Sequence, residues 1–369
     1  MDEKIKKLSY TIVNYSLKLE KGNKVLITSR TNKPILLIKN LIKDINEVGA
    51  IPFVEIKEPK IDSYLLKKQT DERIEEIKKH EKQKVNNYDA FINIRYTTNE
   101  FENIDVDPEI IKKTSTATKE TDFIRVNERK WVLLNYPSEI DAYKAKKNTD
   151  EYFNYALDVM NVDYNKMLKD VLPLKELMEK TDEVRILGPN TDLTFSIKGM
   201  PAIPCCGECN IPDGEIYTAP IKNSVNGVIT YNTPSIYNGN IYNHVSLKFK
   251  DGKIIEATAD NDIDKLNEIF DTDFGSRYIG EFSFGLNPMI LNPVGDILYD
   301  EKIIGSIHFT PGAAYKDAYN GNDSSVHWDL VMIGREEYGG SEIYFDHVLI
   351  RKDGIFVLPE LRQLNYLSK

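Results

Sequence analysis

Cysteine and histidine are scarce in this chain, which has three Cys and five His among 369 residues. All the cysteines, Cys205, Cys206 and Cys209, lie in the run PCCGEC, and an odd number packed so closely cannot form a disulfide framework. Three thiolates cannot complete a Cys₄ zinc site, and the C-x-x-C pair lacks the strand-then-helix setting of a thioredoxin-type motif. The cysteines therefore indicate a reducing compartment.

Long apolar runs and clusters of positive charge are also missing. No stretch of about 18 uncharged apolar residues occurs, which excludes a membrane-spanning helix. The N-terminal segment has charges throughout and no apolar block, so it is not a secretory signal, and we expect a cytoplasmic protein. The formal net charge of −10, with no Lys/Arg run to offset it, argues against nucleic acid and membranes as partners.

Several common catalytic motifs are absent. No G-x-G-x-x-G or G-x-x-x-x-G-K-[ST] follows a strand pattern, which makes nucleotide binding a minority interpretation. The nucleophile elbow G-x-S-x-G and the zinc helix H-E-x-x-H do not occur, and DFG at 273–275 lacks every other kinase element. The sequence therefore carries no serine-hydrolase, zinc-helix or kinase signature.

The first part of the chain alternates helical and strand patterns. Strand patterns such as KVLITS at 24–29 and IPFVEI at 51–56 are separated by helical ones, including a charged helix expected at 61–83. Strands separated by helices of this length imply a mostly parallel sheet with helices on its faces. The sequence therefore predicts an N-terminal α/β domain.

The pattern changes after a second helical stretch. Helical spacing continues through 149–181, where Pro173 is expected to break the helix. Beyond 183, short alternating runs and turn signals predict a β-rich α+β domain. We therefore place an N-terminal α/β domain at 1–182 and a β-rich C-terminal domain, which contains all the candidate metal ligands, at 183–369.

The run SSVHWDL contains the first candidate ligands. If VHWDLVMI is a strand, alternation places His327 and Asp329 on one face and Trp328 on the other. His308, nineteen residues before His327, lies in a second apolar run that could form a neighbouring strand. Each residue taken alone could equally be a solvated polar side chain, so the pair does not establish a site by itself.

Two glutamates occupy comparable positions. In YIGEFSFGLNP, alternation projects Glu281 from a strand whose opposite side is aromatic and therefore core. In NIPDGEIYTAP, Glu215 begins a short strand after a Pro/Gly turn. Tyr315 follows the turn after the His308 strand and could fold back over the same place. Taken singly, these residues could also be solvated or core side chains.

Together, the two His and the carboxylates suit a site for two divalent cations. Carboxylates can bridge two ions, and His adds the borderline softness that suits Zn, Co or Mn. The candidate ligands are Glu215, Glu281, His308, His327 and Asp329.

The order of four runs resembles one known family. NIPDGEIYTAP, GEFSFGLNP, DEKIIGSIHFTPGAAY and SSVHWDLVMIG follow one another as in the thermophilic metalloaminopeptidases of the aminopeptidase T and aminopeptidase S type. A segment of the first half, WVLLNYPSEIDAYKAKKNTDEYFNYALDVMNVDY, extends the resemblance over most of the chain. The resemblance implies that the five candidate ligands coordinate metal, that Tyr315 lies at the site and that the protein is a homodimer. Glu301 resembles a further acidic position, at a longer spacing to His308, or is a solvated turn residue.

Our hypothesis is a metal-dependent aminopeptidase that releases N-terminal amino acids from peptides with a free N-terminus. Two divalent metal ions would activate a water as the hydroxide that attacks the scissile carbonyl. Tyr315 would donate to the oxyanion, Glu281 is the candidate for proton transfer, and Glu301 is a further catalytic candidate. The alternatives are a non-enzymatic peptide- or metal-binding protein with the same fold and a metal-dependent hydrolase of another amide.

Overall fold

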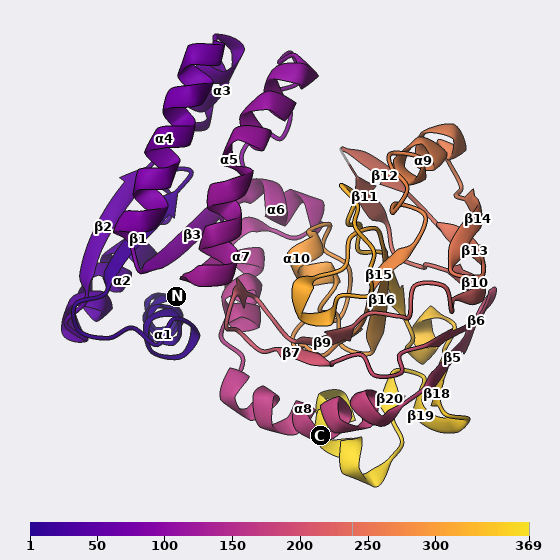
Figure 1. Ribbon diagram of the computed structural model, residues 1–369. Helices are drawn as coiled ribbons and strands as arrows, with labels where there is room; N and C mark the ends of the chain where they lie inside the picture. The colour runs from indigo at the N-terminus through magenta and orange to yellow at the C-terminus, as the bar shows by residue number, and fades with distance from the viewer. Residues whose placement is uncertain (238, 369) are drawn as a thin grey trace. The chain divides into compact units, whose positions relative to one another are not determined.

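The chain forms two compact units in a computed structural model that describes residues 1–237 and 239–368 (Figure 1). Unit 1 comprises Met1–Asn161 and Gly207–Pro212, and unit 2 comprises Val162–Cys206 and Asp213–Lys369. The units thus divide the chain after Asn161 rather than after residue 182, the boundary expected from the sequence.

Helix α8 (Tyr164–Lys180) accounts for this difference in the boundary. The sequence assigned the helix to the N-terminal domain, whereas the structure places it in unit 2. The Tyr366 hydroxyl donates to the Asp170 carboxylate at 3.0 Å, and the Gln363 amide donates to the Asp170 carbonyl at 3.1 Å. These contacts join α8 to the C-terminal segment, and no local sequence pattern reveals them.

Unit 1 is built on a parallel sheet of five strands in the order β2-β1-β3-β4-β8. This arrangement confirms the predicted α/β fold class. The last strand comes from a segment far along the chain, so only its pairing in space reveals it. The strands are β1 (Lys24–Ser29), β2 (Ile51–Ile56), β3 (Ala90–Tyr96), β4 (Lys130–Tyr136) and β8 (Asn210–Ile211).

Helices precede, connect and follow the first four of these strands. The single charged helix expected at 61–83 is two helices, because the Thr70 side chain accepts a hydrogen bond from the Arg73 amide at 3.2 Å and starts a new helix there. The helices are α1 (Asp2–Thr11), which continues as a π-helix (Ile12–Ser16), α2 (Ile35–Glu47), α3 (Pro59–Lys67), α4 (Asp71–Asn87), α5 (Pro108–Glu128), α6 (Glu139–Lys144) and α7 (Thr149–Met160).

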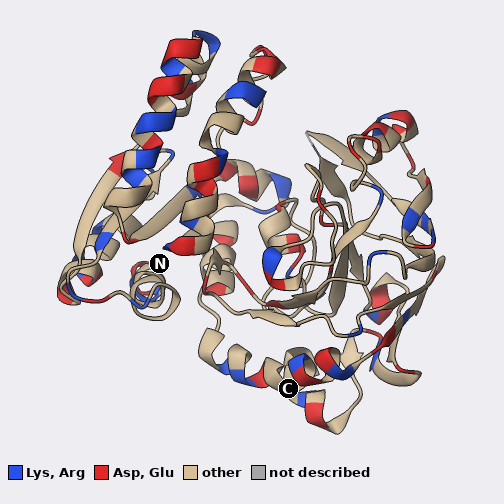
Figure 2. Cartoon of the chain, viewed as in Figure 1, with Lys and Arg blue, Asp and Glu red and all other residues tan. Residues whose placement is uncertain are grey.

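The two faces of the unit 1 sheet are packed differently. The chain steps from β1 to β2 in one direction and from β2 to β3 and β4 in the other, so right-handed crossovers place α2 on one face and α3 to α5 on the opposite face. On the α2 face, Ile27 and Ile92 are completely buried. On the opposite face, α4 buries only Val85 and α5 only Thr121. Both helices carry charged residues along much of their length (Figure 2), so they cover the sheet without filling all the space above it.

Unit 2 contains two large antiparallel sheets and a small third one. The larger sheet has the order β14-β13-β10-β6-β5-β18-β19-β20, and the second has the order β17-β16-β15-β9-β7. Within the described residues, β11 pairs with β12 alone. The strands are β5 (Glu183–Gly188), β6 (Thr191–Ser196), β7 (Ile203–Cys205), β9 (Glu215–Thr218), β10 (Asn226–Thr230), β11 (Ser235–Tyr237), β12 (Asn240–Tyr242), β13 (Ser246–Lys250), β14 (Lys253–Thr258), β15 (Ile279–Gly285), β16 (Ser306–Pro311), β17 (Val331–Ile333), β18 (Glu342–Phe345), β19 (Val348–Lys352) and β20 (Ile355–Phe356).

Few helical elements accompany these sheets, which confirms the predicted β-rich α+β character of the second half. Helix α8 runs through Pro173, so the expected break at that residue is wrong. The interruption lies earlier, where the Asp163 side chain accepts from the Lys166 amide at 2.9 Å and starts α8. The other elements are α9 (Ile263–Phe270), α10 (Ile297–Asp300) and 3₁₀ turns at Lys316–Ala318, Glu336–Tyr338, Pro359–Leu364 and Tyr366–Ser368.

An aromatic cluster joins the two large sheets of unit 2. The Phe195 ring of β6 lies 5.0 Å, centroid to centroid, from both the Phe282 ring of β15 and the Phe309 ring of β16. Because side chains alternate along a strand, the neighbours of Phe282, Glu281 and Ser283, point away from this core. The aromatic core therefore fixes which face of β15 presents its polar residues. None of the helices in the described residues is both long and apolar enough to span a bilayer.

Phe195→Ala is expected to destabilise unit 2 by about 3–5 kcal/mol, because it removes a fully buried ring and leaves a cavity between the sheets. The chain has two tryptophans, so in a Trp131→Phe background the fluorescence of Trp328 follows urea unfolding of unit 2 alone. Phe274→Ala is the matched control, since Phe274 is 78% exposed, and its effect should stay within about 0.5 kcal/mol. Equal effects of the two substitutions would contradict this packing.

Candidate metal centre

Three adjacent strands of the second sheet of unit 2 bring together the first group of candidate ligands. Glu215 begins β9, Glu281 lies in β15 and His308 lies in β16, and all three side chains are buried. One ligand atom from each residue lies within 4.8 Å of the others. The register places His308 opposite Ser283 of β15 and opposite Val331 of β17, so the runs that contain His308 and His327 are neighbours in this sheet, as the sequence suggested.

A second group is formed by Glu281, His327 and Asp329, whose ligand atoms also lie within 4.8 Å of one another. The expected strand through these residues is shorter than predicted, because β17 begins only at Val331. The alternation still holds, since Trp328 is 3% exposed and points into the core. The structure therefore brings all five predicted ligands together, and Glu281 belongs to both groups.

Gly312 allows the segment that carries His327 to approach the end of β16. His327 forms an isolated bridge with Gly312, whose φ of +108° is a conformation that favours glycine. A Cβ atom at this position would lie 2.0 Å from the Val326 carbonyl oxygen. Only glycine fits this close approach, which sets the position of the second ligand group.

Both histidines present the same ring nitrogen to the carboxylates. His308 Nδ1 lies 3.1 Å from the Glu301 carbonyl oxygen, and His327 Nδ1 lies 2.8 Å from the Ala313 carbonyl oxygen. A carbonyl only accepts, so each Nδ1 carries the proton and donates it. This leaves Nε2 of each ring for the site, as in most metal-ligating histidines.

The distances from Nε2 define the centre of the site. His308 Nε2 lies 3.0 Å from Glu281 Oε1 and 3.3 Å from Glu215 Oε2. His327 Nε2 lies 3.3 Å from Asp329 Oδ1 and 3.5 Å from Glu281 Oε2. The His327 Nε2 atom is buried and makes no hydrogen bond within the described residues. A buried polar nitrogen that faces two carboxylates fits a position for a cation.

The charge balance also fits cations. Burial raises the pKa of Glu281 and of Glu301, because it disfavours the charged carboxylate. Although burial lowers the pKa of both histidines, the surrounding carboxylates outweigh it and raise the pKa of His308 to about 9 and that of His327 to about 10. Without metal, protonated histidine rings balance the carboxylates. Bound divalent ions would supply that positive charge instead and would displace the protons.

Lys302 is a buried residue of the site that the sequence did not indicate. Its side chain is completely buried, and its Nζ atom donates to Glu215 Oε1 at 2.9 Å and to the Glu301 carboxylate. Burial lowers the pKa of Lys302, but the negative charges of Glu215 and Glu301 outweigh this effect and raise that pKa. Lys302 therefore offsets one negative charge among the four carboxylates.

The two remaining predicted residues lie at the margin of the clusters. The Glu301 carboxylate belongs to neither ligand group and is paired with Lys302, while its backbone carbonyl orients His308. Tyr315 is half exposed, and its ring centroid lies 4.7 Å from that of His327 and 5.6 Å from that of Tyr217. Their catalytic roles stay predictions.

Two hydroxyl groups hold the carboxylates in place. Thr310 Oγ1 donates to Asp329 Oδ1 at 2.7 Å, and Ser283 Oγ lies 3.2 Å from Glu215 Oε2. Thr310 follows His308 by two residues, so strand alternation could have revealed it. Neither ligand group in the described residues includes a cysteine. Burial, followed by the charges of nearby carboxylates, raises the pKa of Cys205, which keeps that thiol protonated.

Comparisons with known proteins find partial matches to curated aminopeptidases. Aminopeptidase 2 from Geobacillus stearothermophilus is 31% identical over 163 residues, which cover 39% of this chain and 37% of that protein. The match to the other curated relatives is similarly partial, with 44% of aminopeptidase T from Thermus thermophilus covered. The chain thus matches less than half the length of these relatives.

Two solved structures share the fold. Wild-type AmpT from Thermus thermophilus superimposes with a TM-score of 0.81 at 18% identity, and the superposition covers 96% of this chain and 99% of the AmpT chain. The 2,5-dihydroxypyridine dioxygenase from Pseudomonas putida KT2440 has a TM-score of 0.64 at 13% identity, with 98% and 99% coverage. At these identities the likeness shows the fold alone. The thermophilic metalloprotease (M29) family matches residues 1–355, and this chain therefore belongs to that family.

Proposed function

We propose that this protein is a metal-dependent aminopeptidase with two divalent cations at the candidate metal centre. The observation that carries the proposal is that two ligand groups share Glu281, so one carboxylate can contact two ions at once. Membership of a metalloprotease family and similarity to proteins named aminopeptidases support the same activity.

The residues present fit two ions. Glu215 and His308 would hold one ion, His327 and Asp329 the other, and Glu281 would bind both. Mixed imidazole and carboxylate donors suit Zn, Co or Mn. Such ions would supply Lewis acidity, which lowers the pKa of a water toward neutrality and polarises a carbonyl group.

Residues around the ligands would handle the substrate and its protons. The half-exposed Tyr315 would donate its hydroxyl proton to the oxyanion that develops on the scissile carbonyl. Both oxygens of Glu281 face histidines, which suits a ligand more than a proton carrier. Glu301, outside both ligand groups and with its pKa raised by burial, is better placed to carry the proton to the leaving amine.

The carboxylates of the site would also decide which end of a peptide binds. The bound ions and Lys302 would offset the carboxylate charge as a whole, so attraction of the α-ammonium group of a peptide with a free N-terminus would depend on direct contact with one carboxylate rather than on the net charge of the site. We further propose, from the family resemblance, that the protein works as a cytoplasmic homodimer.

Exhaustive chelation is expected to abolish the release of amino acids from unblocked peptides, and Zn, Co or Mn should restore it. The same peptides with an acetylated N-terminus should resist cleavage, because acetylation removes the ammonium group. Chromatography of the released amino acids measures turnover. Atomic emission spectroscopy of the metal content should find two ions per active chain. Undiminished activity after the metal has been removed would overturn the proposal.

Glu281→Gln is expected to reduce the metal content and to lower kcat/KM by about a thousandfold or more, because it removes the ligand common to both groups. Glu301→Gln should keep both ions and lose roughly a hundredfold to ten-thousandfold in kcat, as expected for a proton carrier.

Glu256→Gln is the matched control for both substitutions. Glu256 lies on the exposed side of β14, so the same loss of charge there should change neither metal content nor rate. Circular dichroism confirms that each variant is folded. Full activity of Glu281→Gln would remove Glu281 from the site, and full activity of Glu301→Gln would leave Glu281 as the candidate for proton transfer.

A further inference from the structure

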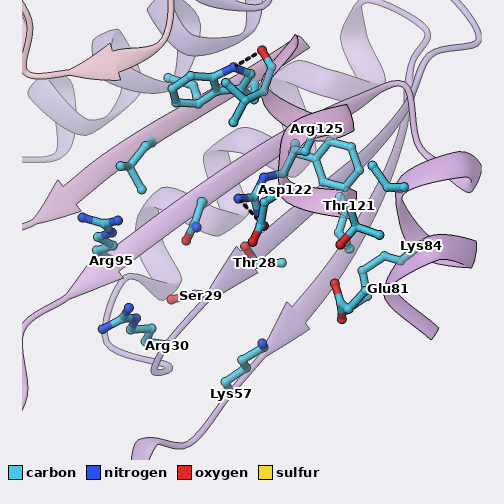
Figure 3. A pocket seen from close by; sticks show the side chains of 18 residues that line it. Thr28, Ser29, Arg30, Lys57, Glu81, Lys84, Arg95, Thr121, Asp122 and Arg125 are labelled. Carbon is cyan, nitrogen blue, oxygen red and sulfur yellow. Dashed lines mark hydrogen bonds and ion pairs between the residues drawn. The ribbon is translucent and has the colours of Figure 1, made fainter. Parts of the chain in front are cut away.

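Unit 1 contains a cavity that is unrelated to the candidate metal centre. It has a volume of about 390 Å³ and lies between the sheet and helices α4 and α5 (Figure 3). This volume falls within the range of small-molecule sites in proteins. The cavity exists because α4 and α5 bury only Val85 and Thr121 and leave space above the strands. None of the lining residues is a candidate metal ligand.

The floor of the cavity changes in character along the strands. Leu26 of β1 pairs in register with Phe91 of β3, and Phe91 with Trp131 of β4, which gives an apolar row across the sheet. Two residues farther along, Thr28 pairs with Asn93 and gives a row of hydroxyl and amide groups. Each step of two residues advances by roughly 7 Å on the same face.

The next step along the same strands brings positive charge. Arg30 follows β1, Arg95 lies near the end of β3, and both line the cavity together with Lys57, which follows β2 (Figure 3). All three side chains are exposed. Among residues 1–237 and 239–368, no hydrogen bond or ion pair engages the side chain of Arg30 or Lys57. Arg30 and Lys57 are therefore available to a ligand.

The other charged residues of the wall largely neutralise one another. Lys84 Nζ lies 2.9 Å from the Glu81 carboxylate, and Arg125 Nη2 lies 2.9 Å from the Asp122 carboxylate. The net positive charge of the cavity therefore resides at the carboxyl ends of the strands. This concentration stands out in a chain with a net charge of −10.

The position of the cavity in the sheet also points to a ligand site. In the order β2-β1-β3, the chain first steps to one side of β1 and then to the other, so the reversal lies between β1 and β3. In open parallel sheets, ligands bind outside the carboxyl ends of the strands at such a reversal. Arg30 and Arg95 lie at this place.

We propose that this cavity binds a small aromatic phosphomonoester, such as a mononucleotide. The aromatic ring would lie on the apolar row, sugar hydroxyls would meet Thr28 and Asn93, and the phosphate would lie among Arg30, Arg95 and Lys57. The lack of a glycine-rich phosphate motif made nucleotide binding a minority interpretation, but that motif recognises phosphate through backbone amides. Side-chain cations recognise it without any glycine.

Titration of the full chain with adenosine 5′-monophosphate, adenosine and inorganic phosphate tests the proposal. The chain has two tryptophans, and a ring bound on the apolar row should change the fluorescence of Trp131. In the variant Trp131→Phe, Trp328 is the single remaining tryptophan. A change in its fluorescence would therefore indicate phosphate bound near the metal centre rather than in the cavity. The monophosphate is expected to bind about tenfold or more tighter than either adenosine or phosphate, because only it engages all three rows.

The double variant Arg30→Gln/Lys57→Gln is expected to weaken monophosphate binding by about tenfold or more and to leave adenosine binding unchanged. Lys39→Gln/Lys43→Gln is the matched control, because it removes two exposed positive charges from α2, on the opposite face of the sheet. The control should bind within about twofold of the unmodified chain, since charges this far away are screened.

Three results would each overturn the proposal. One is no change in Trp131 fluorescence with any probe at millimolar concentration. Another is equal affinity for phosphate and the monophosphate, which would show that the apolar row takes no part. The last is equal loss of binding in the two double variants, which would reduce the effect to overall charge. Aminopeptidase activity enters none of these measurements, so their outcome is independent of the proposed function.

Discussion

A cluster of buried carboxylates on one face of a sheet is the constraint on which the rest of unit 2 depends. A ligand atom of Glu281 lies within 4.8 Å of one from Glu215 in the first group and of one from Asp329 in the second, and without positive partners the burial of Glu215 and Glu281 would be strongly unfavourable. Lys302 and two imidazole rings, each held by a backbone carbonyl, provide these positive partners. The rings and carboxylates leave positions that two cations can occupy, and removing one partner would affect all the others.

The same cluster depends on packing at a distance from it. Phe282 and Phe309 are held against Phe195 of the other sheet, and this contact decides that Glu281 and His308 face away from the core. A shift of one residue in the register of β15 would exchange the aromatic and polar faces. The geometry of the site is therefore a consequence of the aromatic core as much as of the ligands themselves.

The sequence predicted what depends on local periodicity and missed what depends on contacts between distant segments. The period-two pattern around Glu281 and His327 was enough to assign their faces, even though the strand through His327 is shorter than expected. Nothing local marks Lys302 as buried, because its burial results from pairing with Glu215, far away in sequence. The pairing of β8 with β4 and the docking of α8 against the C-terminal segment were beyond sequence reasoning for the same reason.

Unit 1 shows how far the fold alone leaves function open. A parallel sheet with this strand order offers a ligand position wherever the direction of the crossovers reverses, but the side chains at that place decide what binds. Likewise, a dioxygenase shares the overall fold at 13% identity, so the fold does not select the reaction. In unit 2 the candidate ligands come one from each of three neighbouring strands and from the segment before β17, so strand pairing gathers them on one face. In unit 1, alternation along neighbouring strands places apolar, polar and cationic side chains in succession on one face.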